Sequence, residues 1–261
     1  MDKLPNELKN IIREYLIFKP KTKEELQEAV NLWCENKEDA LFKYLHISSW
    51  NTSLITDMRN LFFGKDYFND NISNWDVSSV TDMGGMFMHT TIFNQPLSSW
   101  NVSSVTDMSF MFCSASSFNQ PLDSWDVSSV ITISCMFECA YSFNQPLDSW
   151  DVSSVDNMTE TFNWASSFNQ PLNSWDVSSV DEMGGMFQGA SSFNQPLNSW
   201  DVSSVDDMSY MFRRASSFNQ PINLWNVSSI TDWGNIFEDM CDMFKEAVSF
   251  DKNNALWYDF N

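Results

Sequence analysis

The chain of 261 residues carries 14 basic and 35 acidic side chains, so its formal net charge is −21. No Lys or Arg occurs between Lys65 and Arg213, and without clustered cations we expect neither a nucleic acid partner nor binding to an anionic membrane. No stretch approaches the ~20 apolar residues of a membrane span and no apolar run with a basic flank opens the chain, which predicts no membrane insertion and a cytoplasmic protein that is not obviously secreted.

Residues 1–44 differ in composition from the rest of the chain and hold most of its lysines. Apolar residues recur at helical spacing over about 6–18 and about 22–44, and Pro20 separates the two stretches. We therefore predict a helical N-terminal cap over 1–44, made of two amphipathic helices, on a second domain that spans 45–261.

That second domain repeats with a period of 25 residues. A fixed period of this kind is typical of a solenoid, in which each unit buries its apolar face only against its neighbours. The last coil is irregular, because Phe218 and Phe250 are 32 residues apart. Residues that occupy the same position in successive repeats form what we call a column. Two columns show the period most clearly: the tryptophans Trp50, Trp75, Trp100, Trp125, Trp150, Trp175, Trp200 and Trp225, and the phenylalanines Phe68, Phe93, Phe118, Phe143, Phe168, Phe193 and Phe218.

One repeat, from Phe93 to Ser117, illustrates the local structure that we expect. Apolar and polar residues alternate around Trp100 and Val102, which predicts a short parallel strand with one buried face. From Ser104 to Ala115 a Ser-x-x-Asp helix start is followed by apolar residues at intervals of three and four. The predicted fold class is an α/β repeat solenoid, leucine-rich-repeat-like, with one short parallel strand and one short helix per 25-residue coil.

Several polar and sulfur-containing columns admit both a structural and a ligand-binding interpretation. We interpret the tryptophans and methionines as core packing rather than as a ligand platform or metal site. Asp and Asn interchange along the column that begins at Asp76, which favours backbone hydrogen bonds over a calcium site. We expect an asparagine ladder between coils at Asn94, Asn119, Asn144, Asn169, Asn194 and Asn219.

No catalytic constellation is evident from the sequence. His46 and His89 are the only histidines, and neither is accompanied by a nucleophile, a metal-ligand set or a phosphate-binding glycine motif. Five cysteines at unmatched repeat positions indicate free thiols in a reducing compartment. We therefore expect no enzymatic activity, no cofactor and no metal site.

The repeated block Phe-Asn-Gln-Pro-Leu-x-x-Trp-Asp-Val-Ser-Ser-Val-x-x-Met-x-x-Met-Phe-x-x-Ala resembles the BspA-like leucine-rich repeats of bacterial and mycoplasmal surface proteins, protists and large DNA viruses. The resemblance covers roughly 45–257, and the segment from Thr22 to Cys34 resembles the lead-in to such arrays. It implies a solenoid used for adhesion or protein recognition.

A second, shorter resemblance lies at the start of the chain. The segment Leu-Pro-Asn-Glu-Leu-x-x-Ile-Ile-x-x-Tyr-Leu over residues 4–16 is similar to the opening of an F-box, a module that docks a Skp-type adaptor of ubiquitin ligases. A plain capping helix is the alternative interpretation. The residues that the resemblance implies for adaptor docking are Leu4, Pro5, Leu8, Ile11, Ile12 and Leu16.

Two sets of positions four residues apart vary from repeat to repeat, whereas the interior columns hardly change. Positions four apart share one face of a helix, so we expect these side chains on its outer surface, where they either contact a partner or vary without selection. Aromatic residues and arginine are enriched in interface hot spots. The candidate partner-binding residues are Phe110, Trp164, Tyr210, Arg213 and Arg214.

These features lead to two hypotheses of function. The first is a non-enzymatic protein–protein interaction scaffold, acting as a ubiquitin-ligase substrate adaptor with an F-box-like N-terminus in the cytoplasm of a host cell. The second is a surface adhesin or a virus-particle surface component of the BspA-like type. In both cases the partner is a protein, and an exposed coil edge also allows a homodimer.

Overall fold

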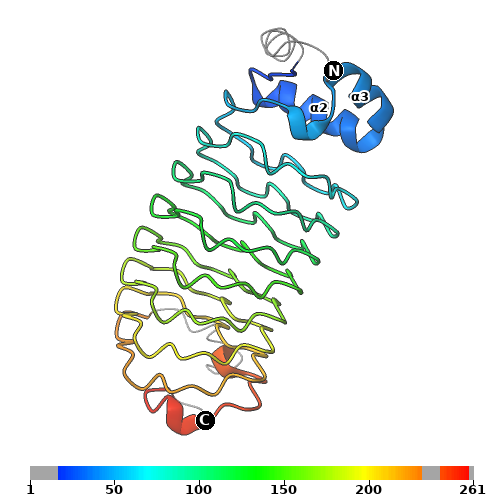
Figure 1. The fold of residues 1–261 in the computed structure, drawn as a ribbon. Coiled ribbons are helices and arrows are strands. Elements are labelled where there is room, and N and C mark those ends of the chain that lie inside the picture. Colours follow the sequence, from blue (N-terminus) through cyan, green and yellow to red (C-terminus); the bar gives the residue numbers. More distant parts are fainter. Residues whose placement is uncertain (1–16, 231–241, 259–261) are drawn as a thin grey trace.

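The computed structural model describes residues 17–230 and 242–258. Two helices, α2 (Lys23–Glu35) and α3 (Lys37–Tyr44), lie at the N-terminal end of a long stack of coils (Figure 1). None of the described helices is long and apolar enough to cross a membrane. Short 3-10 helices occupy Ile47–Ser49 at the start of the stack and Asp242–Phe244 and Lys252–Asn254 at its end.

The helical segment before the stack contains a break at Asn36. Thr22 caps α2, because its hydroxyl accepts a hydrogen bond from the Glu25 N–H at 3.3 Å. Asn36 ends α2 by donating its N–H to the Leu32 carbonyl, and it starts α3 by accepting from the Asp39 N–H at 3.2 Å. The continuous helix expected over 22–44 is therefore two helices. Leu26, Ala29, Val30 and Trp33 bury one face of α2 in the common core.

The α/β fold class predicted for the coils is wrong. The segment around Trp100 and Val102, expected as a strand, has no regular secondary structure and leads into a turn, and the described coils form no sheet. The segment from Ser109 to Ser114, expected as a helix, consists of consecutive turns. The β-pairing between the described coils consists of isolated parallel bridges, which link Asp57, Asp82, Asp107, Thr132, Asn157, Glu182 and Asp207 in succession.

The hydrogen bonds of these turns explain why no helix forms. Within one coil the Cys113 N–H donates to the Phe110 carbonyl at 3.0 Å, three residues back. The N–H groups on either side leave the coil: Phe112 donates to Met136 at 2.9 Å and Ser114 to Glu138 at 2.6 Å, both in the next coil. An α-helix needs every N–H for its own i−4 carbonyl. Apolar spacing of three and four therefore marks a buried face but does not distinguish a helix from overlapping turns.

Aromatic rings fill the inside of the stack, as predicted. Phe137 stacks on Phe143 of its own turn at 4.0 Å between ring centres and on Phe162 of the next coil at 5.7 Å. Trp150 is 3% exposed, and its indole N–H donates to the Leu122 carbonyl of the preceding coil at 2.9 Å. The same donation recurs for Trp75, Trp100, Trp125, Trp175, Trp200, Trp225 and Trp257.

The predicted asparagine ladder is confirmed along one edge of the stack. The Asn144 Oδ1 accepts from the backbone N–H of Asn169 at 3.0 Å and from the Nε2 of Gln170 at 2.9 Å, both one coil further along. Each amide thus satisfies a backbone donor that the turn leaves without a carbonyl partner. In the last coil the Asp251 N–H bonds to Asn219 at 2.9 Å, so the ladder continues past the irregular insertion.

The side chains of the column that begins at Asp76 form local turns, in agreement with the prediction that they make backbone hydrogen bonds. The Asp126 Oδ1 accepts from the N–H of Ser128 at 3.2 Å and from its hydroxyl at 2.7 Å. Asn101 makes the same two bonds to Ser103, at 3.2 and 2.8 Å. Asp and Asn are interchangeable here because only the Oδ1 acceptor is used.

Candidate functional site

Three neighbouring columns carry the side chains that differ most between coils. Each column contains one residue from the turns of each coil. We call the three columns together the variable surface. They are the Gly85 column (Gly85, Phe110, Cys135, Glu160, Gly185, Tyr210), the Met88 column (Met88, Cys113, Glu138, Asn163, Gln188, Arg213) and the His89 column (His89, Ser114, Cys139, Trp164, Gly189, Arg214).

The backbone of this surface is in an uncommon conformation. Residues of the Gly85 and His89 columns have positive φ, for example 58° at Phe110 and 56° at Trp164. Glycine adopts this region freely, and it occurs in both columns, at Gly185 and Gly189. Other residues pay roughly 1–2 kcal/mol for the left-handed conformation. Bulky side chains held at such positions are a recognised mark of functional sites.

Four of the five predicted partner-binding residues gather in the C-terminal coils. The Trp164 ring lies over Gly189, where an added Cβ would sit 2.6 Å from the indole. Because Gly189 has no side chain, the Arg214 guanidinium reaches the Trp164 ring, 5.8 Å from its centre. In the same coil as Arg214, Arg213 lies 5.3 Å from the centre of the Tyr210 ring.

Phe110, the fifth predicted residue, lies two coils before Trp164 on the same surface. The two side chains are similarly accessible, with Phe110 38% and Trp164 37% exposed. The helix on which these residues were expected is absent, and the turns place them on one surface instead. Arg214 is also held from the C-terminal coil, where Glu246 accepts from its Nε at 3.0 Å and from its Nη2 at 3.3 Å.

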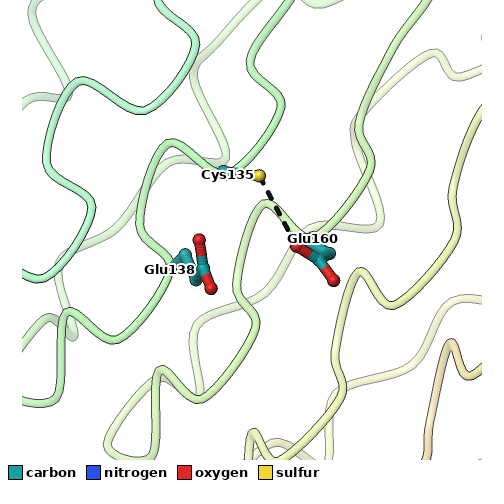
Figure 2. A group of neighbouring side chains, drawn as sticks. All are labelled: Cys135, Glu138 and Glu160. Carbon is teal, nitrogen blue, oxygen red and sulfur yellow. Dashed lines mark hydrogen bonds between the residues drawn. The ribbon is translucent and has the colours of Figure 1, made fainter. Parts of the chain in front are cut away.

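Thiols and carboxylates occupy the coils that connect Phe110 with Trp164. Cys135, Glu138 and Glu160 each offer one ligand atom, and the three atoms lie within 4.8 Å of one another (Figure 2). The Cys135 Sγ donates to Glu160 Oε2 at 3.6 Å, and the Cys113 Sγ donates to Glu138 Oε2 at 3.4 Å. We call Cys113, Cys135, Glu138 and Glu160 the thiol–carboxylate cluster.

Burial controls the ionisation of this cluster. It raises the pKa of the Cys113 thiol to about 12, and Glu138 adds to the effect. Burial, followed by the charges of Glu138 and Glu160, likewise raises the pKa of Cys135 far above its usual range. The pKa of Glu138 is also raised, mainly by burial. At neutral pH the thiols are therefore protonated, which makes them poor nucleophiles and argues against cysteine catalysis here.

The cluster was not predicted from the sequence, although the repeat period places each of these cysteines next to a glutamate. The cysteines themselves share no column, so the period does not relate one cysteine to another. Comparison with other residue types shows that Cys113 precedes Glu138 by one repeat and that Cys135 precedes Glu160 by one repeat. Residues one period apart lie side by side in the stack, so the two pairs were predictable as contacts.

A hollow of about 500 Å³ lies where α2 meets the first coils. Its polar groups are largely paired: Asp70 accepts from the Trp33 indole at 2.8 Å and from the Lys37 ammonium at 2.7 Å. Burial raises the pKa of Cys34, which also lines the hollow, to about 11. These contacts join the helices to the stack and bring together no reactive constellation.

The predicted adaptor-docking residues lie outside the described residues. The structure therefore supplies no contact for the F-box-like segment. They are Leu4, Pro5, Leu8, Ile11, Ile12 and Leu16.

Comparison with known proteins identifies one family. The family described as "Mycoplasma protein of unknown function, DUF285" matches the chain twice, over residues 31–150 and 133–257. The matched ranges together include α3 and the stack of coils. No curated protein matches the chain.

Proposed function

The chain belongs to the DUF285 family, and we propose that it is a non-enzymatic scaffold that binds another protein through the variable surface. The observation that carries the proposal is the contrast between a repeated backbone and unrepeated side chains on this surface. Phe110, Trp164 and Tyr210 stand at left-handed positions that glycine fills in other coils. Trp, Tyr and Arg are also the residues that most often dominate binding energy.

Electrostatics restrict the chemistry of the partner. Near the N-terminal end Arg59 bonds to Asp82 at 2.8 Å and to Asp107 at 2.6 Å, which neutralises part of the acidic surface. After Lys65, no Lys or Arg occurs until Arg213. A partner of the middle coils should therefore present Lys or Arg, and its association should weaken as salt is added.

Site-specific photo-crosslinking in the cells that make the protein tests the proposal. A benzophenone amino acid replaces Phe110, and in a matched control it replaces Leu224, which is 81% exposed and lies outside the variable surface. We expect a discrete crosslinked protein at position 110 that is lost when Trp164→Gly and Tyr210→Gly are added. Equal crosslinking at positions 110 and 224 would argue against the variable surface as the binding site.

The narrower proposal is that the scaffold is a ubiquitin-ligase substrate adaptor, and it stands on the F-box-like sequence alone. Calorimetric titration of the full chain with a eukaryotic Skp-type adaptor tests it, alongside a variant carrying Leu8→Asp and Ile12→Asp. Binding that is lost in the variant supports adaptor docking. Absence of binding by the unaltered chain removes the adaptor role and leaves the BspA-like alternative, a surface adhesin or particle component.

A further inference from the structure

We infer that the thiol–carboxylate cluster binds one zinc-type divalent ion, with Cys135, Glu138 and Glu160 as its three protein ligands and a water as the fourth. The inference does not depend on the proposed partner. The three protein ligands come from two successive coils, and their donor atoms already lie within 4.8 Å of one another (Figure 2).

The distances within the cluster agree with tetrahedral coordination. Zinc binds cysteine sulfur at ~2.3 Å and carboxylate oxygen at ~2.1 Å, so adjacent sulfur and oxygen ligands are about 3.6 Å apart. The Cys135 Sγ lies 3.6 Å from Glu160 Oε2, and the Cys113 Sγ lies 3.4 Å from Glu138 Oε2. The Cys135–Glu160 pair therefore already has the required separation, and a water would occupy the fourth position.

The charges around the cluster also favour a cation. Within the described part of the chain neither Glu138 nor Glu160 forms an ion pair with a basic side chain, and no Lys or Arg occurs between Lys65 and Arg213. Holding two half-buried carboxylates close together without a positive partner is unfavourable. A divalent ion would supply that charge, and the Cys135 thiol would release its proton to solvent on binding.

An unsatisfied oxygen lies in the adjacent position of the same column. Asn163 follows Glu138 by one repeat and is only 4% exposed, yet no donor among the described residues bonds to its Oδ1. Buried acceptors of this kind call for an explanation. A water held by an ion in the cluster would give this oxygen a donor.

The composition of the cluster selects the class of metal. Calcium requires six to eight oxygen ligands and magnesium an octahedral oxygen shell, whereas two carboxylates and one thiol offer a mixed set. Sulfur ligands select zinc and softer ions. We therefore expect Zn²⁺ and its spectroscopic substitute Co²⁺ to bind, and Ca²⁺ and Mg²⁺ not to compete.

Calorimetric titration of the full chain with zinc chloride, in buffer that contains excess magnesium, tests the inference. We expect one equivalent to bind, and Co²⁺ to give the charge-transfer absorption of a thiolate ligand. Cys135→Gly removes the thiol and gives this position the residue that the Gly85 column has at Gly85 and Gly185. Glu160→Gln removes the carboxylate charge and preserves the side-chain shape. Each should weaken binding by at least about 10-fold.

Cys34→Ser is the matched control, because it removes a thiol at the other end of the molecule. Affinity and Co²⁺ absorption should be unchanged in this variant. Circular dichroism establishes that each variant is folded, and Glu138→Gln replaces any that is not. Failure of the unaltered chain to bind a stoichiometric ion, or equal binding by the cluster variants, would overturn the inference.

Discussion

The inside of the stack and the variable surface are built from the same coils but use their residues differently. Inside, each coil packs on a copy of itself: Phe143 stacks on Phe118 of one neighbouring coil and on Phe168 of the other. On the variable surface, Phe110, Cys135 and Glu160 occupy one column without resembling one another. Stacking therefore constrains the interior residues, whereas the surface residues are free to acquire separate roles.

The largest effect is expected from an interior tryptophan. Trp150→Ala removes a buried ring and leaves the Leu122 carbonyl without its indole donor, so the free energy of unfolding should fall by about 3–5 kcal/mol. Urea denaturation followed by circular dichroism measures the change. A loss below about 1 kcal/mol would show that the coils do not depend on the tryptophan column.

A ladder residue should have an intermediate effect. Asn144→Ala leaves the Asn169 N–H and the Gln170 amide without their shared acceptor, which should cost about 1–3 kcal/mol. Asn144→Asp, which retains an Oδ1 acceptor, is the matched control and should lose less. The same denaturation experiment distinguishes them, and equal losses would count against the ladder.

Acidification should produce a smaller, graded loss of stability. Hydrogen bonds from the Ser128 hydroxyl and N–H lower the pKa of Asp126, and those from Ser153 lower the pKa of Asp151. Because the folded-state pKa is the lower one, this stabilisation is present above the ordinary aspartate pKa and is lost as pH falls through the folded-state value. Melting temperatures measured from pH 6 downwards should show the decline.

Asn101 provides the control for that measurement, since it makes the same bonds without a titrating group. The double variant Asp126→Asn and Asp151→Asn should melt close to the unaltered chain at pH 6 and lose less on acidification. An unchanged acid response would assign the effect to other carboxylates.

The smallest effect on stability is expected on the variable surface. Phe110→Gly gives this left-handed position the residue found at Gly85 and Gly185, so relief of backbone strain offsets the loss of a partly exposed ring. We expect the free energy of unfolding to change by less than about 1 kcal/mol. A loss as large as that of Trp150→Ala would make Phe110 a core residue.

The repeat period predicted the stacking of coils, the buried aromatic columns and the asparagine ladder, because each depends only on register. The local structure was not predictable in the same way. Met108, Met111 and Phe112 face the core equally well from a helix or from overlapping turns. The choice depends on whether N–H groups such as that of Phe110 bond within the coil or to the next one, and apolar spacing does not contain that information.

The candidate site was likewise predictable only in part. Variation between repeats located Trp164 and Tyr210 on the surface, but their contacts with Arg214 and Arg213 depend on the turns and on the absent side chain of Gly189. The thiol–carboxylate cluster required comparison of unlike residues one period apart. Its burial, which determines the pKa values, follows only from the three-dimensional packing.

The most direct test of the division between interior and surface combines stability and crosslinking in one pair of proteins. Both carry the benzophenone amino acid at position 110; one adds Trp164→Gly and Tyr210→Gly, and the other adds Trp150→Phe. We predict that the surface variant unfolds at the same urea concentration as its parent but loses the crosslinked partner. The interior variant should unfold earlier and keep the partner while folded. The reverse pattern would contradict the account.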